Sequence, residues 1–461
     1  MTTPDFDLVI HGGQLVTERQ VFSADLAIQG ERIAAVGQDL RGAQELDASG
    51  LLVLPGAVDP HVHLETPVGP TCSSDDWASG TLAAACGGTT TVLDFVEPAP
   101  GESLQQALSA RRALAEGRAW VDFGLHMTLP DASPSRLAEI PVLAERGCTS
   151  FKTYLTYTGF RLEDAELLRV LEAVRESGGL VLVHAESDAI IAHLKRAVTA
   201  EQRALPATHA RVRPAIAEAE AVQRCLALAE VTRARVYLVH LSTALGVEAL
   251  RAARGRGVAA CGETCPQYLL LDQAELERPG FEGAKFVCSP PLRGEADRLR
   301  LWRALAEGDV QTVGTDHCPF NFQLQKELGR QDYELIPGGL PGIESRLALL
   351  YTFGVGSGRL SLERWVQVCS SAPARLFGLE GRKGCLEPGA DADVVLFDPA
   401  RRVTLGKARS HENVDYSPYE GFALQGYPVL TLLHGQVIVR DGQPGGAAGG
   451  RYLERQAAHG S

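Results

Sequence analysis

The sequence predicts an α/β protein: a (β/α)8 TIM-like barrel with a small β-sandwich domain built from both ends of the chain. Two observations predict this architecture. Apolar, β-branched runs alternate with amphipathic helical patterns through the middle of the chain, as parallel strands buried on both faces alternate with their covering helices. Short strand-like segments separated by turns flank this middle region on both sides.

The two flanking regions have the same all-β texture. The first contains DLVIHGGQLV, ADLAIQGERIAAVG and LLVLPG, and the second contains ADADVVLFDP and VLTLLHGQVIVRDG. Glycines stand where hairpin turns need a positive φ. We therefore expect residues 1–54 and 381–461 to form one small β-sandwich domain. Its tail, 442–461, is rich in Gly and Ala, and we expect it to be mobile unless a neighbouring subunit holds it.

The middle region, residues 55–380, is expected to be the barrel. Helical patterns such as EDAELLRVLEAVRESG separate its apolar runs. The eight predicted strands are 57–63, 90–95, 121–129, 149–155, 180–186, 235–242, 258–265 and 311–316. Eight such units favour a closed barrel over an open doubly wound sheet.

Composition excludes several classes of function. A chain of 461 residues is longer than one hydrophobic core usually supports, which agrees with a large and a small domain. The formal charge of -13 argues against binding to nucleic acid, which needs clustered Lys and Arg. The sequence has neither a signal-peptide pattern nor an apolar run long enough for a bilayer. Ten cysteines without a regular framework fit free thiols in the cytoplasm.

Side chains able to bind metal follow five of the eight predicted strands. They are His61 and His63, Lys152, His184, His240, and Asp316. In a barrel the carboxyl ends of the strands converge on one face, where active sites are built. His61 and His63 are two residues apart, so along a strand both side chains point the same way and can hold one ion.

A single histidine after an apolar strand is more often a structural residue than a ligand. The prediction of a metal site therefore rests on a combination of residues in register: an HxH pair, two further strand-end histidines and a strand-end aspartate. Other histidines lie off that register and are expected to be structural. They are His11, His126, His193, His209, His411, His434 and His459.

Lys152 is the unusual member of this set. An ammonium in a desolvated site close to cations is electrostatically costly. Either the lysine pairs with a carboxylate, or it loses its charge. A neutral lysine can add carbon dioxide to form an anionic carbamate that bridges two metals. The sequence by itself leaves both alternatives open.

Several segments of the chain resemble the signature blocks of the amidohydrolase superfamily. These are GAVDPHVHLETP, TSFKTYLTYTG, LVHAES, YLVHLS, GETCPQYLLLD, FVCSPPLR and GTDHCPF. Within the superfamily they most resemble the hydantoinase/dihydropyrimidinase family, from about residue 5 to about residue 440 and in the family's order. SPPLR, CPQYL and a tyrosine five residues after the lysine are more specific than the HxH pair.

The resemblance implies a binuclear centre with two divalent ions per subunit. One ion would lie on His61, His63 and Asp316, and the other on His184 and His240, with N6-carboxylated Lys152 bridging both. Zinc is the usual metal of the family, and mixed nitrogen and oxygen ligands also admit manganese or cobalt. The resemblance further implies a homotetramer.

The implied activity is the hydrolysis of cyclic ureides. Dihydropyrimidines and 5-substituted hydantoins would be opened to N-carbamoyl amino acids. Asp316 would act as base and then acid, and Tyr157 would donate its O–H to the oxyanion. Backbone groups at Ser289 and Gly338 would hold the substrate. The family commonly has Asn at the position of Gly338, which weakens that last assignment.

Two other functions compete with this one. Allantoinase, dihydroorotase or another cyclic amidohydrolase would have the same metal core. The loop LETPVG departs from the DMPFGG-like sequence more usual in hydantoinases, so Leu64, Val68 and Tyr154 are expected to shape a different substituent pocket. A non-catalytic dihydropyrimidinase-like scaffold protein would have lost metal ligands, and all six positions are filled here.

Overall fold

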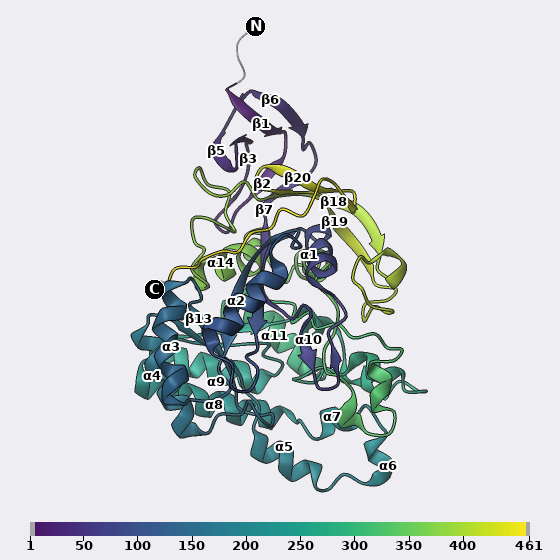
Figure 1. The fold of residues 1–461 in the computed structure, drawn as a ribbon. Coiled ribbons are helices and arrows are strands. Elements are labelled where there is room, and N and C mark those ends of the chain that lie inside the picture. Colours follow the sequence, from purple (N-terminus) through teal and green to yellow (C-terminus); the bar gives the residue numbers. More distant parts are fainter. Residues whose placement is uncertain (1–4, 458–461) are drawn as a thin grey trace.

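The computed structural model describes residues 5–457, which contain a parallel eight-stranded sheet, a seven-stranded sheet, a four-stranded sheet and a two-stranded sheet. His459 lies outside the described residues. The larger body and the smaller sheet domain lie end to end, with the sheet domain at the top of the view (Figure 1). The predicted fold class, a (β/α)8 barrel with a β-sandwich from both chain ends, is confirmed.

The strands of the barrel follow one another around the sheet in chain order, and every neighbouring pair is parallel. The strands are β8 (Ala57–Val62), β11 (Thr89–Val96), β12 (Asp122–Thr128), β13 (Ser150–Tyr154), β14 (Leu180–His184), β15 (Val236–Leu238), β16 (Ala260–Thr264) and β17 (Thr312–Val313). Nearly all of their side chains are buried, as expected for strands covered on both faces.

Helices cover the outside of this sheet. The main ones are α1 (Trp77–Cys86), α2 (Leu104–Ala115), α3 (Pro134–Glu145), α4 (Asp164–Glu176), α8 (Ala215–Thr232), α9 (Ala244–Gly255) and α11 (Glu295–Glu307), followed by the short α12 (Arg346–Leu350), α13 (Leu362–Val366) and α14 (Ala372–Leu376). The long connection after β14 adds α5 (Asp188–Lys195), α6 (Ala200–Arg203) and α7 (Thr208–Arg211), and α10 (Pro266–Leu270) follows β16. Local signals begin several of them: Ser103 caps α2 and forms a capping box with Gln106.

The first and last barrel strands meet at a seam that side chains complete. Val62 pairs with His317 in a parallel bridge, and the Asp59 carboxylate accepts from Thr315 N and Oγ1 at 3.1 and 2.7 Å. The guanidinium of Arg346, which is fully buried, donates to Val58 O and Val313 O at 3.0 and 2.7 Å. Arg346 therefore satisfies carbonyls of both strands at the point where the sheet closes.

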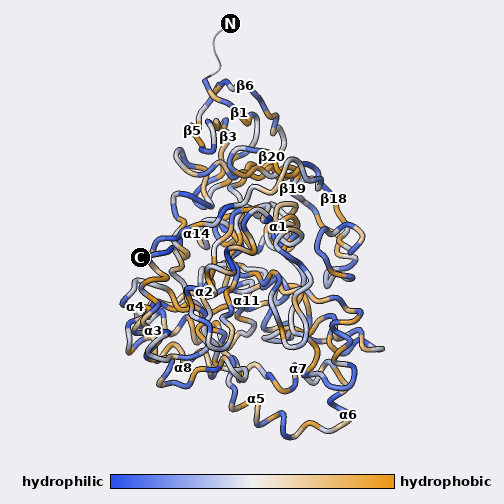
Figure 2. Tube along the Cα trace, viewed as in Figure 1, coloured by the Kyte–Doolittle hydropathy of each residue, from blue (hydrophilic) through white to orange (hydrophobic). Residues whose placement is uncertain are grey.

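The small domain consists of two sheets. The four-stranded sheet has the order β5 (Arg32–Gly37), β4 (Asp25–Gln29), β1 (Phe6–His11) and β6 (Gly42–Asp47). The seven-stranded sheet has the order β21 (Gln443–Pro444), β20 (Gln436–Arg440), β19 (Ala423–Leu433), β18 (Val394–Thr404), β7 (Leu52–Pro55), β2 (Gln14–Val16) and β3 (Val21–Ser23). A separate hydrophobic cluster lies between them, and hydrophobic segments concentrate along β18–β20 and inside the larger body (Figure 2).

The C-terminal tail differs from the expectation of a mobile segment. Phe123 N donates to Arg451 O at 2.9 Å, and Leu453 N donates to Phe123 O at 2.7 Å. Leu453 is fully buried, and Arg455 is nearly so. The tail thus pairs with the chain's own β12 at the amino-terminal end of the barrel. Its glycines allow this approach: a Cβ on Gly450 would stand 1.9 Å from Val121 O.

Within residues 5–457 the structure has no helix that combines the length and the apolar character of a membrane span.

A buried ion cluster joins the barrel to the small domain. Lys383 Nζ lies 2.5 Å from Asp122 at the start of β12, and 2.8 Å from both Asp391 and Asp393 just before β18. His434 Nε2 lies 2.8 Å from Asp122. Burial alone would raise the pKa of Asp122, but Lys383 and His434 lower it to about 2. Lys383 is therefore the cation that bridges the three carboxylates, and its charge keeps Asp122 ionised inside the protein.

We expect Lys383→Met to lower the free energy of unfolding at pH 7 by about 3–5 kcal/mol, because it leaves buried carboxylates without their cation. The native Asp122 contributes stability above its unfolded pKa, and this is lost as the pH falls toward 2. In the variant the unpaired carboxylates are penalised only while ionised, so the deficit should shrink as the pH falls to 4. Denaturant titrations at pH 7 and pH 4 measure both values.

The control for this prediction is Lys195→Met, which removes a partly exposed pair with Glu334 and should cost less than about 1 kcal/mol. A Lys383→Met deficit that stays the same at both pH values would indicate lost packing and contradict the electrostatic explanation.

Candidate metal centre and substrate cavity

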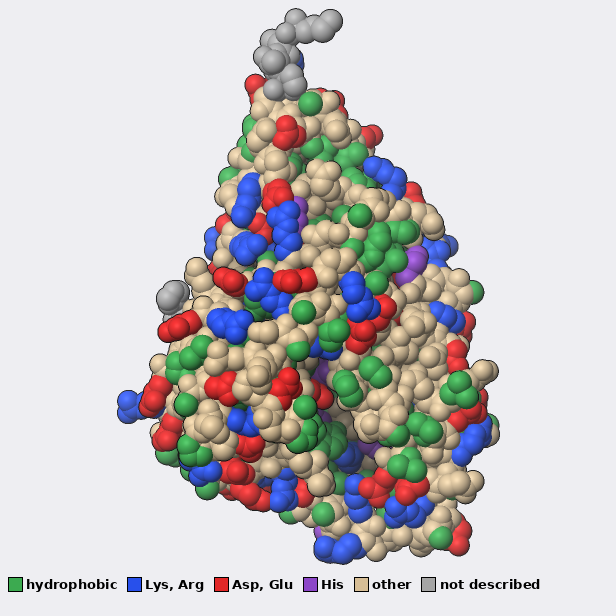
Figure 3. All heavy atoms as spheres, viewed as in Figure 1, with side chains coloured by type: hydrophobic (Ala, Val, Ile, Leu, Met, Phe, Trp, Pro, Cys, Tyr) green, Lys and Arg blue, Asp and Glu red, His purple; other side chains and the backbone are tan. Residues whose placement is uncertain are grey.

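A cavity of about 530 Å³ opens at the carboxyl ends of the barrel strands. Its lining includes His61, His63, Lys152, His184, His240 and Asp316. The space-filling view shows a hollow in this face of the molecule with histidine side chains inside it (Figure 3). The structure therefore brings all six sequence-predicted ligand positions to one cavity.

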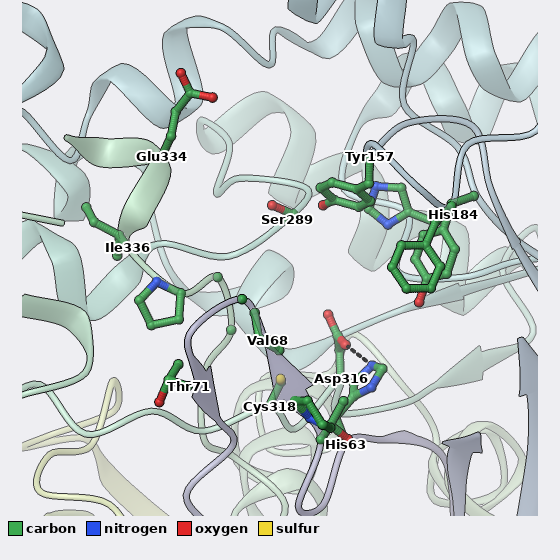
Figure 4. A pocket seen from close by; sticks show the side chains of 18 of the residues that line it. His63, Val68, Thr71, Tyr157, His184, Ser289, Asp316, Cys318, Glu334 and Ile336 are labelled. Carbon is green, nitrogen blue, oxygen red and sulfur yellow. Dashed lines mark ion pairs between the residues drawn. The ribbon is translucent and has the colours of Figure 1, made fainter. Parts of the chain in front are cut away.

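His61, His63 and Asp316 form the first group. The Nε2 atoms of both histidines lie 3.3 Å from Asp316 Oδ1, and the His63–Asp316 pair is drawn in Figure 4. His61 is the last but one residue of β8, and His63 follows directly after the strand. His61 Nε2 is buried and makes no hydrogen bond within residues 5–457. A free imidazole nitrogen and a carboxylate facing one point can hold a divalent cation.

His184 and His240 form the second group. His184 Nδ1 and His240 Nε2 are 3.0 Å apart, with His184 at the end of β14 and His240 two residues after β15. Burial lowers the pKa of both imidazoles, so both are neutral near pH 7. Two neutral imidazole nitrogens directed at each other offer lone pairs to a shared cation.

Lys152 lies within β13 and is almost fully buried. Burial lowers the pKa of its ammonium to about 8, against the opposing effects of Asp316, Glu263 and Glu97. Among the described residues no carboxylate oxygen lies within 4.0 Å of Nζ; the Phe95 and Tyr154 rings lie 5.0 and 5.1 Å away. Of the two alternatives that the sequence left open, the ion pair with a carboxylate is therefore not formed.

The residues of the site adopt unusual backbone conformations. Tyr157, His240 and Asp316 have φ of 76°, 40° and 51°. Positive φ is uncommon outside glycine and costs free energy that the surrounding structure must supply. Three of the sequence-predicted site residues are thus held in conformations that serve the geometry of the cavity.

Two buried carboxylates behind the histidines were not found from the sequence. Glu263 Oε1 lies 2.7 Å from His61 Nδ1 and accepts from His240 N at 3.1 Å. Glu186 Oε2 lies 2.8 Å from His184 Nε2 and accepts from Arg213 at 2.5 Å. A carboxylate on the outer ring nitrogen fixes the tautomer, so the opposite nitrogen faces the cavity with a free lone pair. Glu186 follows the LVLVH strand by two residues, the one signal that could have indicated it.

Tyr157, Ser289 and Gly338 also line the cavity. Figure 4 shows Tyr157 and Ser289 above Asp316 in this view, with Val68 and Cys318 to its left. Burial raises the pKa of Tyr157 to about 12, so its phenol is protonated and can donate a hydrogen bond. A Cβ on Gly338 would lie 3.6 Å from Ser289 Oγ, so these two residues face the same part of the cavity.

One expectation needs correction, and one histidine expected to be structural lies at the site. His209 lines the cavity, and its Nε2 lies 3.1 Å from Ser289 Oγ and 3.0 Å from Cys288 O. The long connection after β14 brings it there, which strand register could not reveal. Leu64 does not shape the substituent pocket, because it is fully buried in the hydrophobic core, whereas Val68 and Tyr154 do line the cavity.

Lys326 holds together the segments that carry Ser289 and Gly338. Its side chain is fully buried, and Nζ donates to Val287 O, Pro337 O and Gly339 O at 2.9, 2.9 and 2.8 Å. An ammonium has three donors and all three are used. This lysine therefore fixes the spacing of two chain segments that form one wall of the cavity.

Histidines and an aspartate converge at the carboxyl face of a (β/α)8 barrel. This arrangement is typical of metal-dependent hydrolases, and comparison with known protein families points to the same class. The sequence matches the Amidohydrolase family over residues 52–438. The chain belongs to the amidohydrolase family, whose members bind divalent metals in a binuclear centre.

Within this family the relatives identify the branch. The chain is 44% identical to the D-hydantoinase of Geobacillus stearothermophilus over 97% of this chain and 96% of that protein. It is 42% identical to the D-phenylhydantoinase of Escherichia coli over 97% and 98% of the two chains. The crystal structure of dihydropyrimidinase from Brevibacillus agri superposes with a TM-score of 0.96 at 43% identity, covering 98% of this chain and 99% of that one. The chain is a member of the hydantoinase/dihydropyrimidinase family of cyclic amidohydrolases.

We expect Lys326→Met to lower the free energy of unfolding by about 2–4 kcal/mol, because three buried carbonyls lose their donor. The amide of Gly339, which donates to Val287 O at 3.0 Å, should exchange its hydrogen faster. Denaturant titration and hydrogen–deuterium exchange over residues 321–340 measure the two effects. Lys285→Met is the control, since Lys285 pairs at a partly exposed site with Glu282. Unchanged exchange at Gly339 in a folded Lys326→Met variant would contradict this role.

Proposed function

We propose that this protein hydrolyses the cyclic amide bond of dihydropyrimidines and 5-substituted hydantoins, releasing N-carbamoyl amino acids. The observation that carries the proposal is the convergence of six metal-binding positions on one cavity beside a protonated tyrosine. The full-length similarity to D-hydantoinases supports the substrate class.

The proposed centre holds two divalent ions. His61, His63 and Asp316 would hold one ion, and His184 and His240 the other, with Lys152 between them. The donor set fits, because two of its histidines are 3.0 Å apart with low pKa values and His61 Nε2 has no hydrogen-bond partner in the described chain. Zinc is the metal we propose, and manganese or cobalt also matches mixed nitrogen and oxygen donors. When bound, the ions lower the pKa of water and polarise a carbonyl oxygen.

Lys152 is proposed to bridge the two ions in N6-carboxylated form. With a pKa of about 8, a useful fraction of the amine is neutral near pH 7. Its nitrogen lone pair can attack carbon dioxide, and loss of one proton gives the carbamate anion. This reaction replaces a buried cation by an anion, which two bound divalent ions would attract, so it favours the assembled centre electrostatically.

Asp316 and Tyr157 are the proposed catalytic residues. Burial tends to raise the pKa of Asp316, but His61, His63 and Lys152 lower it, so the carboxylate is ionised and can accept a proton from the attacking water. It would then deliver this proton to the departing ring nitrogen. Tyr157 would donate its phenolic hydrogen to the carbonyl oxygen as negative charge develops there.

Backbone groups of Ser289 and Gly338 are proposed to hold the ureide. Both residues line the cavity on the wall that Lys326 fixes. A glycine at position 338 leaves the backbone accessible, since it has no side chain between the chain and the ligand.

Another cyclic amidohydrolase activity, on allantoin or dihydroorotate, would use the same metal core and is the second candidate. Values of kcat/KM on dihydrouracil, 5-substituted hydantoins, allantoin and dihydroorotate separate the candidates directly. The non-catalytic scaffold alternative would require that metal-binding residues have been lost. All six positions have a residue that can bind metal, so this alternative has no support. The homotetramer that the resemblance implies and the cytoplasmic location that the cysteines and the N-terminus indicate stay predictions. Sedimentation of the purified protein tests the first.

We expect Asp316→Asn to keep its metal, because the amide oxygen can still coordinate, and to lose about 10²–10⁴-fold in kcat, because the amide cannot shuttle a proton. Turnover of hydantoin and elemental analysis of the same sample measure both. Asp332→Asn, which affects a carboxylate paired with Arg203 away from the ligands, is the control. Wild-type kcat in Asp316→Asn would show that the proton takes another route.

We expect Lys152→Ala to bind fewer than two ions per subunit and to lose measurable turnover, because the bridging ligand is gone. Inductively coupled plasma mass spectrometry gives the metal content. Lys195→Ala, which changes another lysine of the cavity lining, should keep both ions. Two tightly held ions in Lys152→Ala would rule out the bridging role.

A further inference from the structure

Glu97 is an acidic residue of the cavity that the proposed mechanism does not use. It follows directly after β11, at the same carboxyl face of the barrel as the ligands, and it lines the cavity. Its side chain is half-buried. Within residues 5–457 its carboxylate makes no hydrogen bond and no ion pair. An acid without a partner in a ligand cavity is costly for the free protein.

The charge of Glu97 affects the pKa of nearby side chains, and these side chains indicate where in the cavity Glu97 lies. Its carboxylate acts electrostatically on Tyr154 and Cys318, and His63 acts on Glu97 in turn. Figure 4 shows Cys318 next to Val68 and close to His63. Glu97 therefore lies in the part of the cavity that Tyr154, Cys318 and His63 line.

No cation among the described residues pairs directly with Glu97: His63, Arg111 and Lys152 act on it only through their charge, and Arg111 is paired with Asp94 at 2.5 Å. The two-stranded hairpin of β9 (Pro67–Val68) and β10 (Thr71–Cys72) forms part of the cavity lining, and Thr66 and Phe160 also line the cavity. These side chains are apolar or neutral. Lys195 lines the cavity as well, but it is paired with Glu334 at 2.6 Å. Lys152 has no carboxylate within 4.0 Å, as described above.

A cyclic ureide substrate has three parts that must each face one part of the cavity: the reacting amide, the rest of the ureide group and the substituent on the ring carbon. Its reacting amide must face the metal ligands, and its ureide group would face Ser289 and Gly338. The substituent on the ring carbon then projects to the remaining wall, which contains Val68, Tyr154 and Glu97. This step rests on the proposed function.

We infer that Glu97 selects substrates whose ring substituent carries a positive charge, such as an aminoalkyl or guanidinoalkyl group. A cationic substituent gives the carboxylate the partner that the protein does not provide, and a low-dielectric cavity strengthens that pair. Burial already raises the pKa of Glu97, which indicates that the free anion is poorly solvated. An apolar substituent of the same length fills the same space but leaves the anion unpaired.

The test compares two hydantoins of matched shape: 5-(4-aminobutyl)hydantoin, which is cationic at pH 7, and 5-pentylhydantoin, which is neutral. We expect the wild-type enzyme to prefer the aminobutyl compound in kcat/KM. Glu97→Gln should lower kcat/KM for the aminobutyl compound by about tenfold, the effect of one partly buried charge pair. The value for the pentyl compound should stay within about threefold or rise.

Glu334→Gln is the matched control, because Glu334 is also a cavity carboxylate but is already paired with Lys195 and Arg203. It should not change the ratio between the two substrates. Added salt should raise KM for the aminobutyl compound in the wild-type enzyme and much less in Glu97→Gln. This salt effect can be measured in the wild-type protein alone.

The outcomes are distinct. An equal loss on both substrates would mean that Glu97 acts on the metal centre and would overturn the inference, as would a wild-type enzyme without preference for the cation. If the metal-loaded wild-type enzyme opens neither hydantoin, the proposed function itself fails. If it opens the pentyl compound at least as well as the aminobutyl compound, only the role of Glu97 fails.

Discussion

The chemistry of this molecule depends on one cluster of side chains at the barrel mouth. Their nitrogen and oxygen atoms have free electron pairs, and no cationic side chain in the described part of the protein pairs with them. Burial lowers the pKa of the His61, His184 and His240 imidazoles and lowers the pKa of Lys152 to about 8. In isolation such a cluster would be unstable, because buried polar atoms lack partners. A pair of divalent ions resolves this deficit, so metal binding and the integrity of the barrel mouth are energetically linked.

Rigidity around this cluster comes from the residues behind it. Glu263 reaches both His61 and the backbone of His240, so one carboxylate orients ligands of both proposed ions. Glu186 orients His184 and is held by Arg213, whose guanidinium also lies over the Tyr157 ring at 5.2 Å. The two halves of the cavity are thus connected through buried charge pairs, and a displacement at one would be transmitted to the other.

The sequence was sufficient for the barrel, the small sheet domain and the six strand-end positions, because burial on both faces and residue spacing are local signals. Glu263, Lys326 and His209 could not be found in this way. Each functions through contacts with distant segments, and each looks like an ordinary polar residue in its own neighbourhood. The tail was misjudged for the same reason: its Gly-rich composition resembles a flexible linker, whereas Gly450 permits a close backbone approach to Val121.

That backbone pairing has a consequence for how the chain assembles. Arg455, near the end of the described chain, inserts among residues of the barrel interior, with its guanidinium 2.8 Å from Ser150 Oγ across 305 positions of sequence. Among the described strands, β7 likewise pairs only with segments on either side of the barrel sequence. During synthesis the ribosome must therefore release nearly the whole polypeptide before either domain can be completed. The growing chain must wait in a partly folded state with exposed strand edges, the stage at which molecular chaperones are needed.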